Sequence, residues 1–160
     1  MISIKKLLIS LAFLLILLSA CSEKKKEVTK LENVDSSELL IIQKVEGNSK
    51  ATEDNIIVKD KKKIEQILAM VDGIKVEETT SKYMMDEMKK HTTYMFNFEE
   101  DQGIKSGENV AYAFDILEDG TIFFTHKDVH SVQKPRISIE KHKDLLKKIQ
   151  MLTENEQKQK

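Results

Sequence analysis

The strongest constraint on the fold is a pair of apolar segments joined by a three-residue turn signal. The sequence VAYAFDIL at 110–117 is followed by Glu-Asp-Gly at 118–120 and then by TIFFTH at 121–126. An Asp-Gly pair between two apolar runs is typical of a β-hairpin, because glycine readily adopts the positive φ of tight turns. The chain is therefore expected to contain an antiparallel sheet.

Four further segments have the composition of strands. They lie at 38–47, 55–59, 74–79 and 94–100, and in the last of these an aromatic residue stands at every second position. Alternation of period two predicts a strand with one buried face. Residues 127–136 are expected to be irregular or to contain a short edge strand.

Two helices are predicted from apolar residues at helical spacing. One follows Asp60 as its N-cap and ends at Asp72-Gly73, and the other follows Ser138 as its N-cap. The expected buried faces are Ile64, Ile67, Leu68 and Val71 in the first helix, and Leu145, Leu146, Ile149 and Leu152 in the second.

The segment 79–93 has the most ambiguous pattern in the chain, and Tyr83, Met84 and Met88 would line one side of a third, short helix within it. Methionine fills irregular gaps in cores, so we expect core packing, with a mobile binding surface as the alternative. These elements predict an α+β fold, mainly an antiparallel sheet of about five to six strands with two to three helices packed on it. The alternative is a mixed sheet with one βαβ crossover around 55–78.

The first 20 residues differ from the rest of the chain. Fifteen of them are apolar, and Lys5 and Lys6 precede an apolar core at Leu7–Leu18. The run without charge, Leu7–Ser22, has 16 residues, whereas a membrane span needs about 20. A basic start, an apolar core and small residues at the end are the parts of a secretory signal peptide.

The end of this segment, Leu18-Ser19-Ala20-Cys21, resembles the bacterial lipobox, in which an aliphatic residue and two small ones precede a cysteine. The resemblance implies that the Cys21 thiol receives a diacylglyceryl group, and that a signal peptidase recognises Leu18, Ser19 and Ala20 and cuts before Cys21. No other cysteine is present, so an internal disulfide is excluded. Two acyl chains hold a protein stably at a membrane surface without a membrane span.

The predicted organisation is a removed signal peptide at 1–20, a lipidated cysteine with a flexible charged tether at 21–37, one globular domain at 38–153 and a frayed tail at 154–160. The predicted location is the extracytoplasmic face of the cell membrane. Ser22 after the cysteine is compatible with outer-membrane sorting, which is the alternative location in a two-membrane bacterium.

Motifs for catalysis or cofactor binding are weak. A net charge of −1 gives no field for nucleic acid, so no nucleic-acid partner is expected. His126 and His130, with Asp128 between them, have a metal-ligand spacing that needs a helix, but their segment leaves a strand. The carboxylates Glu99–Asp101 cluster at a strand end, where acidic side chains are usually solvated. We expect no catalytic residues, no metal and no other cofactor.

The lipobox, the lysine-rich tether, IIVKDKKKIEQIL at 56–68 and EDGTIFF at 118–124 together resemble small lipoproteins of Bacillus-type bacteria, including the YhfM-like group. The resemblance covers about residues 38–150 besides the lipobox. It implies a Gram-positive cell with one membrane and a domain that faces the wall. That group is largely of unknown function, so it implies no catalytic or binding residue.

The predicted function is a non-catalytic binding module at the membrane, whose ligand is a protein, a peptide or an envelope component. The surfaces expected to contact the ligand are the methionine-rich segment 83–88 and the loop 101–109. Two alternatives remain open, a small cell-envelope hydrolase that uses carboxylates near Glu99–Asp101 and a metal-binding lipoprotein that uses His126 and His130.

Overall fold

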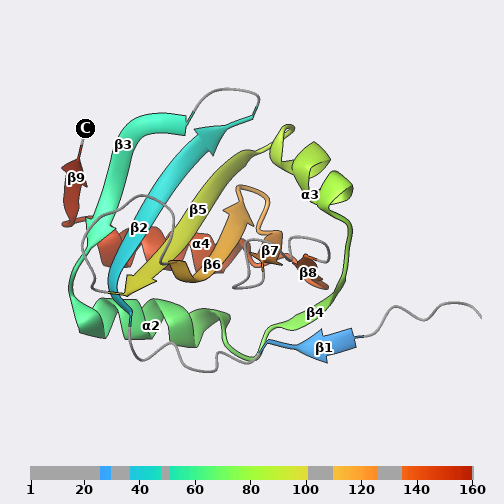
Figure 1. Ribbon diagram of the computed structural model, residues 1–160, viewed down its shortest axis with the longest axis horizontal. Coiled ribbons are helices and arrows are strands. Elements are labelled where there is room, and N and C mark those ends of the chain that lie inside the picture. The colour runs from blue at the N-terminus through green and yellow to red at the C-terminus, as the bar shows by residue number, and fades with distance from the viewer. Residues whose placement is uncertain (1–25, 30–36, 48–50, 101–109, 126–134, 160) are drawn as a thin grey trace, which may run out of the picture.

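Antiparallel pairing organises the computed structural model, which describes residues 26–29, 37–47, 51–100, 110–125 and 135–159. Within these residues the chain forms a nine-stranded sheet and three helices (Figure 1). The strands are β1 (Lys26–Val28), β2 (Ser37–Glu46), β3 (Ala51–Val58), β4 (Lys75–Glu78), β5 (Thr92–Glu100), β6 (Val110–Leu117), β7 (Ile122–Thr125), β8 (Arg136–Ser138) and β9 (Gln157–Gln159). The helices are α2 (Lys61–Val71), α3 (Ser81–Met88) and α4 (Lys143–Thr153).

The order of the strands in the sheet is β1-β4-β8-β7-β6-β5-β2-β3-β9, and every neighbouring pair is antiparallel. The predicted α+β fold with an antiparallel sheet is therefore confirmed, whereas the predicted five to six strands are too few. The mixed-sheet alternative is wrong. Strands β3 and β4 run in the same direction, but five other strands lie between them. Helix α2 thus connects distant strands across one face and does not form a local parallel crossover.

Three strands have only three residues each. Two of them, β1 and β9, were not predicted, whereas β8 begins at Arg136, the last residue of the segment for which a short edge strand was one of the two expectations. Strand β1 lies within the segment expected to be a tether, and β9 lies within the segment expected to be a frayed tail. Strand β8 is interior, because it pairs with both β7 and β4. Their sequences KEV, RIS and QKQ are too short to show a periodic pattern. Backbone hydrogen bonds to a neighbouring strand define them, and sequence periodicity does not report those bonds.

One side of the sheet, called the helix face here, packs against α2 and α4. At its centre the rings of Phe96 in β5 and Phe114 in β6 stack with their centroids 4.7 Å apart. The alternating aromatic residues predicted for β5 therefore do point to one side. The buried residues of this core are Leu40, Ile42, Val58, Ile64, Ile67, Leu68, Val71, Ile74, Val76, Phe96, Phe98, Phe114, Ile116, Ile122, Phe124, Leu146 and Ile149.

Helix α2 begins and ends where the sequence predicts. The Asp60 carboxylate accepts a hydrogen bond from the Lys62 N–H at 2.9 Å, which satisfies one of the free N–H groups of the first turn. Gly73 follows the helix with a φ of +77°, a conformation that glycine adopts without a steric penalty. The four apolar residues predicted to face the core are all buried.

Helix α4 begins at Lys143, so the predicted N-cap at Ser138 is wrong. Ser138 ends β8, and its hydroxyl accepts a hydrogen bond from the Ile122 N–H at 3.0 Å. Ser138 therefore stabilises the contact between two neighbouring strands and does not cap a helix. The N–H of His142, the residue before α4, donates to the Gly120 carbonyl at 2.7 Å, which joins the helix start to the β6–β7 turn. The predicted apolar stripe is confirmed, since Leu146 and Ile149 are buried and Leu145 and Leu152 pack beside them.

The other side of the sheet, called the second face here, carries α3. Met84 of α3 is buried against Leu117 and Phe123, with Met88 and Ile137 at the border of this cluster. Leu117 and Phe123 alternate along their strands with helix-face residues, so they point to the opposite side. The helices are thus divided between the two faces, and Figure 1 shows α3 well apart from α2 and α4.

Candidate functional site

The residues predicted to anchor the chain, Leu18–Cys21, lie outside the described residues, as do the loop 101–109, His126 and His130. None of the helices that the structure describes is long and apolar enough to cross a membrane. Lipidation of Cys21 and the histidine-based metal site therefore stay predictions from the sequence. Within the described ranges there is no group of three or more side chains that could hold a metal ion.

The predicted carboxylate cluster is described only in part. Glu99 is half buried near the end of β5, where it pairs with Val110 of β6. The backbone of Glu100 pairs with Ser37 of β2, and Asp101 lies beyond the described part of the strand. The side chains of Glu100 and Asp101 are not among those described, so the carboxylate cluster stays a prediction from the sequence.

The methionine-rich helix α3 divides its side chains between the core and the solvent. Thr80 caps the helix by accepting a hydrogen bond from the Tyr83 N–H at 3.1 Å. Met84 and Met88 are four residues apart and pack inward, as predicted. Tyr83 is 48% exposed and Met85 is 54% exposed. The prediction that Tyr83 lies on the same side of the helix as Met84 and Met88 is therefore wrong. A neighbouring position on a helix is rotated by about 100°, which takes Tyr83 off the packed side.

The described residue with the most unusual environment is Asp115, in the middle of β6. Its register partners are Met95 of β5 and Phe123 of β7, so its carboxyl group lies on the second face between two apolar side chains. Asp115 is only 7% exposed. Burial raises the pKa of this carboxyl from 3.8 to about 7. Among the described residues, none donates a hydrogen bond to it.

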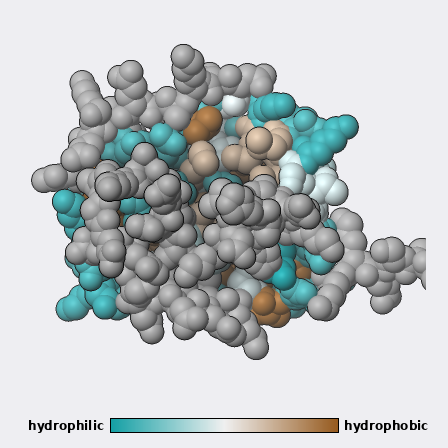
Figure 2. All heavy atoms as spheres, viewed as in Figure 1, coloured by the Kyte–Doolittle hydropathy of each residue, from teal (hydrophilic) through white to brown (hydrophobic). Residues whose placement is uncertain are grey.

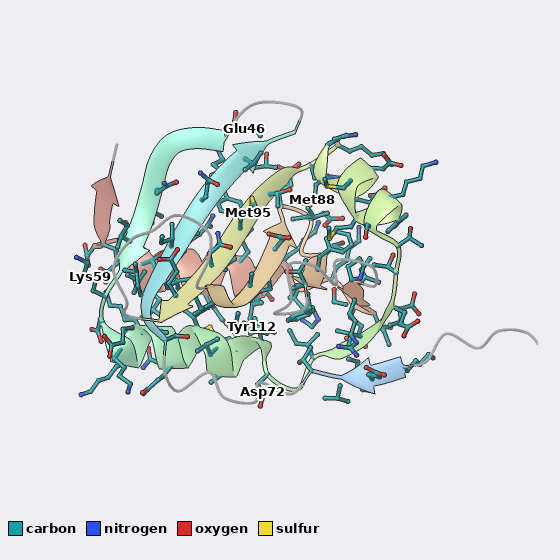
Figure 3. All side chains as sticks on the ribbon, in the orientation of Figure 1. Glu46, Lys59, Asp72, Met88, Met95 and Tyr112 are labelled. Carbon is teal, nitrogen blue, oxygen red and sulfur yellow. The ribbon has the colours of Figure 1, made fainter. Side chains whose placement is uncertain are left out.

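The described neighbours of Asp115 on the second face are neutral side chains. They belong to two adjacent cross-strand rows, and most of them are half buried. The first row is Gln43, Met95, Asp115, Phe123 and Ile137, and the second is Ile57, Ile41, Asn97, Ala113 and Thr125. Beyond Ile137 the first row continues to the charged Glu77 of β4. Figure 3 labels Met95 on β5 and Met88 at the end of α3. Where described residues are visible in Figure 2, hydrophobic and hydrophilic ones lie next to each other.

This arrangement suits recognition. A carboxyl with a pKa near neutral donates a hydrogen bond when protonated and accepts one, or pairs with a cation, when ionised. Strongly perturbed carboxyl groups with an identifiable physical cause are candidates for functional sites. Asp115 was not among the residues predicted from the sequence, although one signal was available. Asp115 is the only charged residue in VAYAFDIL, and it stands where the alternation points away from the aromatic side.

A hollow of about 250 Å³ lies between the α2–β4 turn and the segment that precedes α4. Its lining combines charged and neutral groups, namely Asp72, Gly73, Ile74, Lys75, Glu140 and His142. His142 lies just before α4 and is half buried at the wall of this hollow.

Comparison with known proteins identifies no relative of this chain. No protein-family model matches it, and neither the curated proteins nor the solved structures gave a match.

Proposed function

We propose that the chain is a lipoprotein held by Cys21 at the extracytoplasmic face of a membrane, and that its domain is a non-catalytic binding module for a protein, a peptide or an envelope component. The anchor is supported by the order of features in residues 1–21, a basic start, an apolar core and Leu-Ser-Ala-Cys. A soft thiol suits alkylation, and its use for lipid accounts for a lone cysteine in an exported chain.

The binding role is carried by one observation, the buried carboxyl of Asp115 among neutral side chains of the second face, to which no described residue donates a hydrogen bond. Burying a carboxyl group is costly, and such groups are candidates for functional sites. The exposed side chains of Tyr83 and Met85 extend the apolar surface at the α3 end. A ligand that covers this surface would contact rigid elements, two strands and a capped helix. Rigid elements position a binding surface more accurately than loops do.

Site-specific photo-crosslinking in living cells tests the binding role. A photoreactive residue replaces Met85 in the full chain, and in the matched control it replaces Met151 of α4, which is 67% exposed. Helix α4 packs on the helix face, so the control position lies on the other side of the sheet. We expect one discrete adduct from position 85 and none from position 151. Equal adducts at both positions, or none at either, would contradict the proposal.

The anchor is tested independently by Cys21→Ala. We expect the wild-type chain in the membrane fraction with fatty acid attached to its N-terminal residue. The variant should remain as a precursor without that label. A variant that still carries labelled fatty acid at the same place would refute the assignment of Cys21.

A further inference from the structure

The segment next to the lipidation site is fixed to the edge of the sheet. Strand β1 pairs with β4 in the register Lys26↔Glu77, Glu27↔Val76 and Val28↔Lys75. The Arg136 guanidinium of β8 reaches across β4 to the Glu27 carboxylate at 2.6 Å, and both side chains are largely shielded from solvent. A guanidinium group can donate two parallel hydrogen bonds to a carboxylate, which fixes the geometry of the pair. Residues 26–29 therefore belong to the folded domain.

Thr29 completes this attachment at the C-terminal end of α2. Its N–H donates to the Ile74 carbonyl at 2.9 Å, and its own carbonyl accepts from the Gly73 N–H at 3.1 Å. Its hydroxyl donates to the Val71 carbonyl at 2.9 Å and accepts from the Ile74 N–H at 2.9 Å. These four hydrogen bonds join Thr29 to three residues, and together they are called the latch here. They also satisfy backbone groups that the end of a helix leaves free.

The latch shortens the free linker. Four residues, 22–25, separate Cys21 from Lys26, whereas a tether that ended at residue 37 would contain sixteen. Five Cα steps span at most about 18 Å, and a flexible coil of that length averages about 12 Å. A lipid on Cys21 would hold the β1–β4 edge next to the headgroups. Figure 1 shows β1 and β9 at opposite ends of the sheet, so the β9 end would point away from the bilayer.

The surface beside β1 is suited to that position. Val28, Lys75 and Ile139 form a cross-strand row on the second face, because Val28 pairs with Lys75 and the Ile139 N–H donates to the Lys75 carbonyl at 3.0 Å. Val28 is 52% exposed and Ile139 is 41% exposed. Lys75 and Lys26 are also exposed, and Glu77 pairs in register with Lys26 on the same face. Lys24 and Lys25 precede β1 in the sequence. Aliphatic side chains among lysines are characteristic of surfaces that rest on anionic lipid headgroups.

We propose that the domain rests on the anionic bilayer that anchors it, with the β1–β4 edge inward, and that Lys26, Val28, Lys75 and Ile139 contact the headgroups. This inference rests on the proposed lipidation of Cys21 and adds a fixed orientation to it. The latch at Thr29 sets the orientation, because it prevents the anchor from acting as a long flexible tether.

The test uses the lipidated full chain, purified from membranes and placed in vesicles of phosphatidylcholine and phosphatidylglycerol that contain a nickel-chelating lipid. Because Cys21 is occupied by lipid, an introduced cysteine is the sole free thiol and carries a spin label. The near label is at Glu140→Cys, next to Ile139, and the far label is at Lys59→Cys, after β3. We expect several-fold stronger relaxation by nickel at position 140 than at position 59.

Two variants separate the latch from the charge. Thr29→Val removes both hydroxyl hydrogen bonds and should bring the two labels toward equal relaxation, whereas the control Thr79→Val should not. Replacing Lys26 and Lys75 by glutamine should lower the relaxation contrast by about half, as should omitting phosphatidylglycerol. The matched control replaces Lys61 and Lys62 of α2 by glutamine and should leave the contrast unchanged.

The outcomes distinguish this inference from the proposed function. Mass spectrometry of the purified chain shows whether lipid is attached. If lipid is absent, the proposed anchor is wrong. If lipid is present but the two labels relax equally, the fixed orientation is wrong while the anchor stands. Equal contrast in vesicles with and without phosphatidylglycerol would overturn the contact with anionic lipid.

Discussion

Replacing Asp115 by asparagine should stabilise the protein at neutral and alkaline pH and have little effect in acid. The reason is that the carboxyl of Asp115 is 7% exposed and lies between Met95 and Phe123 on the second face. Asparagine has nearly the same shape but no charge, so it removes the cost of ionising a buried group and keeps the packing.

The direction and the magnitude of this change in stability follow from the pKa of Asp115. Burial raises the pKa of Asp115 from 3.8 to about 7, so between these values the folded protein holds a proton that the unfolded chain has released. Unfolding therefore becomes easier as the pH rises from about 4 to about 7. At about 1.4 kcal/mol per pH unit the full penalty is about 4 kcal/mol, and relaxation around the ionised group reduces the expected gain for Asp115→Asn to about 2–4 kcal/mol above pH 7.

Urea unfolding of residues 22–160, followed by far-ultraviolet circular dichroism between pH 4 and pH 8.5, measures the effect. The stability difference between variant and wild type should grow with pH and level off above about pH 7. Asp86→Asn on α3 is the matched control, with an expected difference within about 0.5 kcal/mol at every pH. A difference for Asp115→Asn that does not change with pH would refute the assigned environment, as would a variant that is less stable at pH 8.

Three further predictions concern the turns and the core. In Gly120→Ala the added Cβ would lie 2.4 Å from the Lys143 nitrogen, and the φ of this residue is +89°, so we expect the free energy of unfolding to fall by about 2–4 kcal/mol. In Gly73→Ala the added Cβ faces open space, and the free energy of unfolding should fall by only about 1 kcal/mol. Equal losses in urea unfolding would contradict this reading. Partial burial opposes ionisation of Asp119, but bonds from Lys141 and Thr121 outweigh it and hold its pKa at about 2. Asp119→Asn should therefore lower the free energy of unfolding by about 1 kcal/mol at neutral pH, and this difference from the wild type should vanish as the pH falls from about 4 to 2. A difference that stays constant over this pH range would contradict the pairing of Asp119 with Lys141. Phe114→Ala should lose about 3–5 kcal/mol by calorimetry because its ring is fully buried, and a loss below about 1 kcal/mol would disagree with the stacked core.

The sequence predicted the elements whose signals are local. The hairpin around Glu118–Gly120 and the aromatic alternation of β5 were correct, because pleating fixes the side on which each residue lies. The limits of α2 were also correct, because Asp60 and Gly73 satisfy the helix ends themselves. In each case the physical cause acts within a few residues of the signal.

The sequence did not predict features that depend on distant partners. Strand β1 exists because β4 offers a free edge, because Thr29 bonds to the end of α2, and because Arg136 holds Glu27. The nearest of the residues bonded in this way, Val71, is more than forty residues away from β1. Ser138 has the composition of a helix cap, yet its hydroxyl is taken by Ile122 of a neighbouring strand. Asp115 was overlooked because its burial depends on β5 and β7, which flank it in the sheet.

The intact mass and N-terminal peptide of the chain, purified from bacterial membranes in detergent, test the central claim most directly. We expect a protein that begins at Cys21, with residues 1–20 removed and the mass of a diacylglyceryl group added to the cysteine. Digestion should place that added mass on the peptide that contains Cys21 and Ser22. A chain that retains residues 1–20, or one that begins at Cys21 with an unmodified thiol, would contradict the lipid anchor.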